Sequence, residues 1–594
     1  MSEENNTQLD EECPINLKIG LGKFDSTSTW VRPNRLWMKT YPEWIPKTLD
    51  YESLEKLNGL FCILKLATLN CPNNIAIYFK PKEEKYSYRE LLIYSLKIAS
   101  ALKALGVKKG DPVALNSKNC SEFIIAMWAC IKLGAVLVPI NYLLKKHEVF
   151  HIFNDCGDIK TAIVHEKNLK LYKRSSKELG LEKIVLIRED KNVEKEIKIA
   201  DDVELIFFHE LLNSYEPLDA KISINMKEDL FCLLYTGGTT GLPKGVMLTH
   251  FNVISNINQL LHIGAEFSEE AVEKNIGKLS FVNILPLCHS FGVISTLTYT
   301  SAACQLIVYD SFDIPSILET IEMYKVENFA GVPTMYIMIA NHPDFKKRDL
   351  TSLTNVITAG AALAPAFAKQ WEEIAKVEVR QGYGLTECSP GTHLQPQKWA
   401  KWVHNSIGLP ILDTDVKIVN PDTLDELETG QDGELLIRGP QVMKGYWKNS
   451  EATNRVLIKD ENGNTWLRTG DIGRIDENGY FYISGRTKEM IKYKGYRIMP
   501  ADVEANLYEH PAVLEVGVIG VPDEIAGEKI KAFIRLRPEY KETTAEEITE
   551  WAKENMAGYK WPREIEFVKS IPKTAVGKVM RRALKEKELK NQKS

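Results

Sequence analysis

The stretch YTGGTTGLPKGVMLTH, residues 235–250, decides how the rest of this sequence is interpreted. It follows the apolar run DLFCLL, which is typical of a buried strand, and precedes a segment with helical character from about Asn252. Glycines let backbone N–H groups face an anion, threonine hydroxyls add donors or a metal ligand, and Lys244 adds a positive charge. These are the groups that a triphosphate needs, so the stretch predicts a phosphate-binding loop.

Two familiar nucleotide motifs do not describe this stretch or its neighbours. A Walker A loop has Gly-Lys followed by Ser or Thr, whereas Lys244 lies between Pro243 and Gly245. The GYG run at 382–384 lacks the third glycine of a dinucleotide fingerprint. A short stretch rich in Gly and Thr is on its own more typical of a surface loop. Both interpretations therefore stay open until other motifs are considered.

The whole chain has the composition of an ordinary globular protein. Its 594 residues exceed what one hydrophobic core usually serves, which predicts roughly two to four domains or subdomains. Apolar residues make up 44% and charged residues 26%, and the formal net charge of −5 gives no reason to expect a nucleic-acid partner. Ten cysteines without a CxxC pair indicate reduced thiols rather than disulfides or a zinc site.

No segment of the sequence predicts secretion or a membrane span. Residues 1–12 are acidic and polar, without the basic start and apolar stretch of a secretory signal. The longest apolar run, residues 123–144, is interrupted by Lys132, Gly134 and Pro139, which is more typical of a buried helix followed by a buried strand. We therefore expect a cytoplasmic protein without a transmembrane segment, and peripheral contact with a membrane stays open.

Helical and β-rich segments alternate from Tyr86 onward. Ser87 and Glu90 form a predicted capping box for a helix that Gly106 ends, and DPVALNS follows as a strand. Helices between short β-rich runs predict parallel sheets with helices packed outside. Residues 166–205, rich in Lys and Glu, are expected to form a surface excursion.

Two changes of pattern divide the C-terminal half. After about Asp413, short β-rich runs with Gly and Pro-Asp turns predict a small barrel-like subdomain, and from about residue 489 a compact α+β pattern begins. The predicted fold is α/β, with a large N-terminal domain of two helix-flanked sheets, a small β-barrel subdomain and a small α+β C-terminal domain. The predicted bounds are 1–45 for an N-terminal extension, 46–485 for the large domain with 413–485 as its β-rich part, and 486–594 for the C-terminal domain.

Four further motifs follow the first in a fixed order: QGYGLTECSP (381–390), WLRTGDIG (466–473), GRTKEMIKYKGYRI (485–498) and PKTAVGKVMRR (572–582). Over about residues 45–590 the chain resembles the adenylate-forming superfamily of acyl-CoA synthetases, firefly luciferases and peptide-synthetase adenylation domains. Gly237 and the strings AGVPTMYIMIANHPDF and NSIGLPILDTDVKIVNPDT most resemble medium- to long-chain fatty acyl-CoA synthetases. The run ITAGAALAP (357–365) departs from SGGAPL, which relatives commonly have.

The resemblance implies an AMP-forming ligase that uses ATP, Mg²⁺ and coenzyme A. A carboxylate and ATP would give an acyl-adenylate and pyrophosphate, and thiolate attack would then give acyl-CoA and AMP. Neither step needs a covalent enzyme intermediate, so the site must mainly position substrates and stabilise charge. Thr240 and Glu387 would help to hold Mg²⁺, which suits hard oxygen ligands.

The resemblance also assigns nucleotide-binding roles. Lys244 and the glycine-threonine loop would cradle the β- and γ-phosphates, Tyr383 would face adenine, and Asp471 would accept from the ribose hydroxyls with Arg486 donating nearby. The predicted set in the large domain is Thr236, Gly237, Gly238, Thr239, Thr240, Lys244, Gln381, Gly382, Tyr383, Gly384, Thr386, Asp471 and Arg486.

The C-terminal domain is implied to be mobile, with a hinge near Lys488. Lys578 would bridge the carboxylate and the α-phosphate during adenylation, and rotation of the domain would then replace it with the KYKGYR segment. The predicted contacts with AMP or CoA phosphates in that segment are Lys492, Lys494, Gly495 and Arg497.

His289 and Phe291 in LPLCHSFG align with the family's gate to the acyl site. No acidic residue lies between 285 and 300, where amino-acid adenylation domains place an aspartate for the substrate ammonium, so an uncharged acyl tail is favoured. The predicted acyl pocket is His289, Phe291, Gly331, Gly360 and Ala361, and the predicted catalytic residues are Lys578, Thr240, Glu387 and His289.

Alternatives remain for single residues and for the whole chain. Taken alone, Glu387 could cap a helix, Tyr383 could be a core aromatic and Lys578 a solvated tail lysine. An aryl or other acid, an acceptor other than CoA, or an inactive nucleotide-binding protein with an interaction role are the rival functions. The acyl chain length and the oligomeric state, monomer or homodimer, stay undecided.

Overall fold

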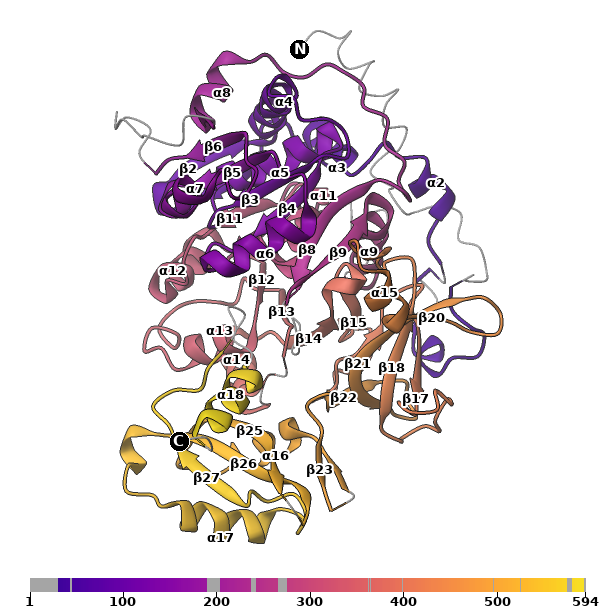
Figure 1. Cartoon of the computed structure of the whole chain (residues 1–594), viewed down its shortest axis with the longest axis vertical. Helices are drawn as coiled ribbons and strands as arrows, with labels where there is room; N and C mark the ends of the chain where they lie inside the picture. Colours follow the sequence, from indigo (N-terminus) through magenta and orange to yellow (C-terminus); the bar gives the residue numbers. More distant parts are fainter. Residues whose placement is uncertain are drawn as a thin grey trace.

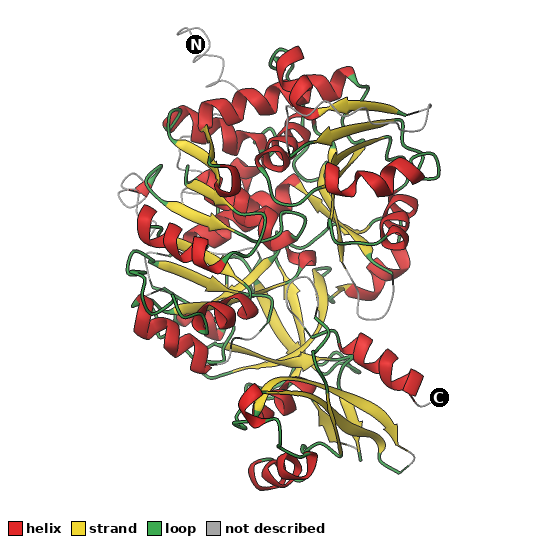
Figure 2. Cartoon of the chain, turned by 90° about the vertical axis from the view of Figure 1, so that its left-hand side faces the viewer, coloured by secondary structure: helices red, strands yellow, loops and turns green. Residues whose placement is uncertain are grey.

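The computed structural model contains two large sheets, two small sheets and the helices that cover them (Figure 1). Figure 2 shows the small C-terminal sheet below the stacked helices and strands of the rest of the chain. The residues that the structure describes are 30–42, 45–46, 48–189, 203–236, 242–264, 275–361, 363, 365–397, 399–494, 496–523, 525–573 and 579–591.

The first large sheet has nine strands: six central strands are parallel, β2 pairs antiparallel with β1 at one edge, and β15 pairs antiparallel with β14 and β16 at the other. In spatial order they are β16 (Leu409–Pro410), β15 (Gly391–Leu394), β14 (Val379–Gly384), β13 (Asn355–Thr358), β12 (Asn328–Gly331), β10 (Ser280–Asn283), β11 (Gln305–Val308), β1 (Ile75–Phe79) and β2 (Glu84–Ser87).

The second large sheet has eight strands, in which β9 pairs antiparallel with both of its neighbours, β8 and β19, and the other pairs are parallel. In spatial order they are β19 (Gly445–Tyr446), β9 (Lys244–Thr249), β8 (Leu230–Thr236), β4 (Val136–Ile140), β3 (Pro112–Asn116), β5 (Thr161–His165), β6 (Lys183–Ile187) and β7 (Glu204–Phe207).

Five helices lie between the two large sheets, because their buried residues form one hydrophobic cluster with residues from both sheets. These are α3 (Phe61–Asn70), α4 (Tyr88–Ala104), α5 (Ser121–Leu133), α9 (His250–Gly264) and α11 (Ser290–Ser301). Separate clusters hold α12 (Ile314–Tyr324), α13 (Pro333–Ala340) and α14 (Pro365–Ala375) on the first sheet, and α6 (Lys146–Cys156) and α7 (Leu169–Ser175) on the second. The shorter helices are α2 (Tyr51–Glu55), α8 (Phe208–Ser214) and α15 (Ser450–Val456). The α/β class predicted for the large part of the chain is confirmed.

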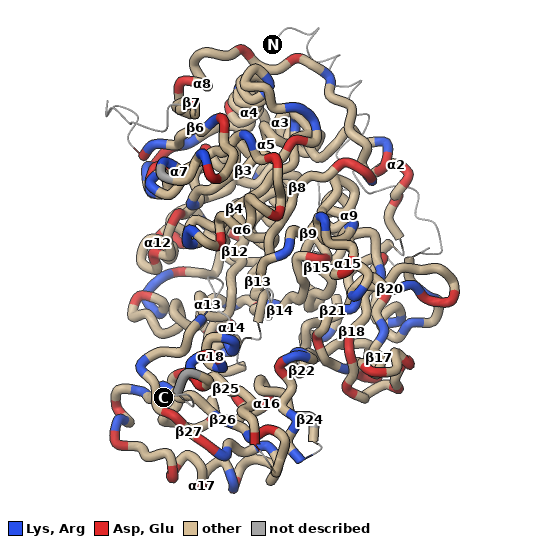
Figure 3. The backbone as a smooth tube through the Cα atoms, in the orientation of Figure 1, with Lys and Arg blue, Asp and Glu red and all other residues tan. Residues whose placement is uncertain are grey.

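Two five-stranded sheets complete the fold. One contains β17 (Asp415–Val419), β18 (Gly433–Arg438), β20 (Leu457–Lys459), β21 (Thr465–Ile475) and β22 (Phe481–Arg486). The other contains β23 (Ile491–Tyr493), β24 (Tyr496–Ile498), β25 (Val513–Asp523), β26 (Gly527–Leu536) and β27 (Glu564–Phe567), with α16 (Pro500–Leu507), α17 (Ala545–Asn555) and α18 (Arg581–Asn591). Figure 3 shows acidic and basic residues interspersed along the chain, in keeping with the small net charge.

Local sequence signals explain many of these elements. The capping box predicted at Ser87 and Glu90 is present, and Gly134 ends α5 in a left-handed conformation before the buried strand β4. The surface excursion expected at residues 166–205 is wrong in part: Lys183–Ile187 forms β6, with four of its five residues buried in the second sheet. The run KIVLI of this strand is flanked by many charged residues, so the composition of the whole region is typical of an exposed segment.

The described part of the N-terminal segment packs against the β-rich sheet. Trp37 is 2% exposed and contacts the ring of Phe481, and Arg32 and Arg35 both pair with Asp415, whose side chain is fully buried. Among the described residues, no helix combines the length and the apolar character needed to cross a bilayer. All nine cysteines in the described ranges are free thiols.

Candidate active site

The stretch that opened the sequence analysis joins two antiparallel strands. Thr236, the last residue of β8, lies opposite Lys244, the first residue of β9, and the strand pairing continues to Leu230 and Thr249. The sequence predicted a strand before the loop and a helix after it, but it did not predict β9 between them. Gly237, Gly238, Thr239 and Thr240 lie outside the described residues.

Lys244 belongs to a cluster of three charged and aromatic side chains. Its Nζ lies 5.0 Å from the centre of the Tyr446 ring, and the Tyr446 hydroxyl donates to Oε1 of Glu387 at 2.7 Å. The pairing of β19 with β9 brings Tyr446 to this place. Burial, and then the carboxylate of Glu387, raise the pKa of the Tyr446 hydroxyl, so this hydroxyl remains a donor.

A second cluster forms where β21 and β22 pair with each other. Asp471 lies directly opposite Arg486, whose Nε donates to Oδ1 at 2.9 Å, and the Tyr383 hydroxyl donates to Oδ2 at 2.6 Å. The side chain of Asp471 is 6% exposed. The nearby Asp471 carboxylate raises the pKa of Arg486, whereas burial and then Asp471 raise the pKa of Tyr383 well above its ordinary value. The arrangement is a buried carboxylate fixed by two donors.

The predicted residues at 331, 360–361 and 381–384 lie in or just after three neighbouring strands. Gly331, Thr358 and Gln381 pair across β12, β13 and β14, and parallel strands end at the same edge of their sheet, where α/β proteins bind ligands. Gly384 needs its missing side chain, because a Cβ there would lie 2.0 Å from the carbonyl oxygen of Pro390.

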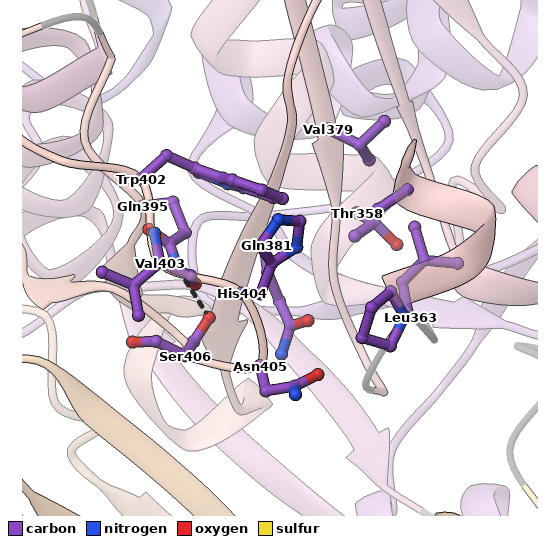
Figure 4. A pocket seen from close by; sticks show the side chains of 12 residues that line it. Thr358, Leu363, Val379, Gln381, Gln395, Trp402, Val403, His404, Asn405 and Ser406 are labelled. Carbon is purple, nitrogen blue, oxygen red and sulfur yellow. Dashed lines mark hydrogen bonds between the residues drawn. The ribbon is translucent and has the colours of Figure 1, made fainter. Parts of the chain in front are cut away.

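Gln381 is one of the residues that line a small pocket (Figure 4). Residues 402–406 form one wall, and Thr358 and Leu363 lie on the opposite side. The Gln395 amide donates to the carbonyl oxygen of Ser406 at 2.8 Å and fixes the first wall. Oγ1 of Thr358 is buried and has no hydrogen-bond partner in the described part of the chain.

The predicted acyl gate lies at the start of α11. His289 precedes the helix and is exposed, Phe291 is half-buried, and the Ser290 hydroxyl lies 3.2 Å from that of Thr386. Gly292 permits close packing of the helix against the preceding loop, since a Cβ there would lie 2.2 Å from the carbonyl oxygen of Pro286. The gate segment therefore contacts the segment that carries Tyr383 and Glu387.

Three of the predicted C-terminal residues, Lys488, Lys492 and Lys494, can be placed in the structure. Lys488 is exposed in the turn after β22, and the backbone N–H groups of Lys492 and Lys494 donate to Glu528 and Ala526 of the small sheet. Gly495, Lys578 and the side chain of Arg497 lie outside the described residues.

Two residues that contact this region were not predicted. Tyr446 links Lys244 to Glu387, and Arg581, the first residue of α18, binds both carboxylate oxygens of Glu504 and also Glu489, next to Lys488. Tyr446 lies in the unremarkable run KGYWKN, so only the strand pairing identifies it. Arg581 belongs to a motif that was recognised, but its partners are distant in sequence.

Comparison with known proteins defines the class of this chain. Residues 66–447 match the model of the AMP-binding enzyme family, and residues 502–578 match the model of the AMP-binding enzyme C-terminal domain. The first match covers more than half of the chain. The protein therefore belongs to the AMP-binding enzyme family, and the resemblance inferred from the five motifs is confirmed.

Individual members of the family are similar to this chain over most of its length. The chain is 34% identical to a long-chain-fatty-acid–CoA ligase of Bacillus subtilis and 31% identical to one of Escherichia coli O157:H7, in each case over 93% of this chain and 98% of the relative. Among solved structures, ATP-bound MatB from Rhodopseudomonas palustris is 25% identical with a TM-score of 0.78, covering 89% of this chain and 98% of MatB.

Proposed function

We propose that this protein is an ATP-dependent fatty acid–CoA ligase that forms an acyl-adenylate and then an acyl-CoA. The observation that carries the proposal is the similarity to long-chain-fatty-acid–CoA ligases along 98% of their length, across both family domains. The five motifs and the clusters around Asp471 and Lys244 support the same chemistry.

Asp471 would bind the ribose hydroxyls of the nucleotide. A ribose presents two hydroxyl donors, and the buried carboxylate of Asp471 is held in place by Tyr383 and Arg486. Because a carboxylate has about four acceptor sites, two remain for the sugar. Adenine would lie beside Tyr383 and the edge formed by Thr358 and Gln381, where the buried Thr358 hydroxyl has no partner among the described residues.

The phosphates would lie between the β8–β9 hairpin and Glu387. Mg²⁺ in nucleotide enzymes is held by one or two carboxylates together with phosphate oxygens, and the half-buried Glu387 fits this requirement. When bound, the ion supplies neutralisation of the leaving pyrophosphate. Tyr446 orients Glu387, and Lys244 adds a positive charge on the same side.

We propose that the two half-reactions use different faces of the C-terminal domain, residues 486–594. Lys578 would serve adenylation, and rotation near Lys488 would bring Lys492 and Lys494, both exposed on the small sheet, toward AMP or CoA phosphates. Arg581 supports this arrangement because it ties the start of α18 to Glu489, next to the proposed hinge. We place the enzyme in the cytoplasm, where CoA and ATP are both available.

The decisive experiment incubates the protein with ATP, Mg²⁺ and fatty acids of graded length, with and without CoA. We expect pyrophosphate release with fatty acids and acyl-CoA only when CoA is present. Aryl acids that outcompete fatty acids would redefine the substrate, and acyl-AMP that accumulates regardless of CoA would rule out the ligase. Lys578→Ala should abolish adenylation and leave thioester formation from supplied acyl-AMP largely intact.

A further inference from the structure

Helix α6 contacts both strand ends of the β8–β9 hairpin. The Tyr235 hydroxyl, at the end of β8, donates to Oδ2 of Asp155 at 2.9 Å, and Nε2 of His151 lies 2.7 Å from the carbonyl oxygen of Pro243, next to β9. A proline carbonyl can only accept, so His151 is the donor. His151 and Asp155 are four residues apart, so they lie on one face of the helix.

The same helix end also holds the strand that carries Tyr446. The Trp447 Nε1 and the Lys448 Nζ both donate to the carbonyl oxygen of Cys156, the last residue of α6, at 2.9 and 3.0 Å. The Tyr235 ring packs against Gly245, where a Cβ would lie 3.1 Å from the ring. Helix α6 thus contacts the end of β8, the residue before β9 and the two residues after β19.

A separate set of apolar contacts attaches the helix to the sheet. Val149, Ile152, Phe153 and Cys156 are buried in the hydrophobic cluster beneath α6, and they supply the attachment. His151 and Asp155 instead form one hydrogen bond each with the two strand ends that flank the proposed phosphate loop. Their arrangement is that expected of groups that fix where Thr236 and Lys244 stand.

We propose that His151 and Asp155 are positioning residues for ATP: through Pro243 and Tyr235 they hold both ends of the β8–β9 hairpin, and thereby Lys244, in the geometry that binds the β- and γ-phosphates. The inference rests on the proposed function, since it assumes that this hairpin receives the triphosphate. Neither residue touches substrate. AMP, which lacks these phosphates, does not depend on the two contacts.

The test compares the binding of a non-hydrolysable ATP analogue and of AMP to the full chain by titration calorimetry. His151→Ala and Asp155→Ala should each weaken the ATP analogue about tenfold and change AMP affinity less than about twofold. His151→Gln keeps an N–H donor and should restore most of the affinity. Asn154→Ala, an exposed change on the same helix, is the matched control.

Two further measurements separate positioning from a structural role. Asp155→Ala and Tyr235→Phe remove the same hydrogen bond, so their combination should cost no more than the worse single variant. Pyrophosphate exchange should fall in these variants while thioester formation from supplied acyl-AMP stays within about twofold of wild type. Equal weakening of ATP analogue and AMP, or unchanged ATP affinity, would overturn the proposal. The binding assay needs no acyl substrate. It can therefore support or contradict this proposal even if the ligase assay fails.

Discussion

The Asp471 and Lys244 clusters differ in how completely they are assembled. Asp471 is 6% exposed, and both of its oxygens already have a donor, Tyr383 or Arg486. Lys244 is exposed, and its described contact is with the face of the Tyr446 ring. In the proposed reaction the nucleoside stays bound through both steps, whereas pyrophosphate leaves after the first. We call the surroundings of Asp471 the nucleoside end and the surroundings of Lys244 the phosphate end. An enclosed nucleoside end suits a group that stays bound, and an open phosphate end suits a product that leaves after the first step.

The largest effect is expected for Asp471→Ala. The change removes the proposed ribose acceptor and leaves the buried Tyr383 hydroxyl without its partner, which together cost about 3 kcal/mol, or about 100-fold in rate. Because the nucleoside is bound in both steps, adenylation and thioester formation should fall together. Assays of both half-reactions check this, with Asp432→Asn as control, because Asp432 is more exposed and lies just before β18 of the same sheet. Loss of adenylation alone would mean that Asp471, like Lys244, serves only the first step, which would contradict the proposed difference between the two clusters.

Lys244→Ala should have a smaller and more selective effect. An exposed lysine that meets a phosphate contributes roughly 1–2 kcal/mol, so adenylation should fall about tenfold. AMP binding and thioester formation should stay near wild type, because the pyrophosphate has left by then. Lys444→Ala, which removes an exposed lysine paired with Glu228, is the control. A matching loss of AMP affinity would show that Lys244 serves the nucleoside end instead.

Tyr446→Phe tests a single contact beside Lys244, the hydrogen bond from the Tyr446 hydroxyl to Glu387. The variant keeps the ring that faces Lys244 and removes only the hydroxyl that orients Glu387. The hydroxyl would act on Mg²⁺ only by orienting Glu387, so we expect an effect of about 1 kcal/mol, and the Mg²⁺ concentration for half-maximal adenylation should rise about fivefold. A Mg²⁺ titration of pyrophosphate release measures this, with Tyr482→Phe as control because its hydroxyl donates to Asp476 elsewhere. An unchanged Mg²⁺ requirement would argue against Glu387 as the metal-facing carboxylate.

Short-range signals made part of this structure predictable. The α/β class, the helix capped at Ser87 and the change of pattern after Asp413 followed from periodicity, capping and turn residues. The proposed nucleotide-binding residues come from motifs, and those that the structure describes in the large domain lie in or beside strands. Asp471 and Arg486 lie in two separate motifs, and strand pairing places them opposite each other.

The remaining contacts depend on residues that are far apart in the chain. Strand β9 was missed because GVMLTH runs directly into helix α9, without a turn signal between strand and helix. Tyr446 reaches Glu387 across 59 positions, and Tyr235 reaches Asp155 across 80. Neither tyrosine has a local pattern that sets it apart from a core aromatic, so only the folded arrangement identifies their partners.

The last expected effect is on stability rather than on activity, and it concerns pH and the buried histidine beside Tyr383. Burial lowers the pKa of His393 to about 3, and its ring lies edge-on to those of Tyr383 and Phe481. The neutral form is therefore favoured in the folded state, while the unfolded chain takes up a proton near pH 6.5. Stability from this group is fully present above pH 6.5 and is lost as pH falls toward 3, by up to about 1.4 kcal/mol per pH unit.

A variant that cannot titrate isolates this contribution. His165 and His250 also have pKa values lowered to about 4 by burial, so wild type should lose stability in acid for more than one reason. His393→Gln should have a lower melting temperature than wild type at pH 7.5, and the gap should narrow between pH 6.5 and 5. Thermal unfolding across this pH series measures the gap, with AMP binding at each pH as a readout of the nucleoside end. A gap that stays constant with pH would mean that His393 contributes packing alone, and the rigidity of the nucleoside end would then not depend on a neutral imidazole.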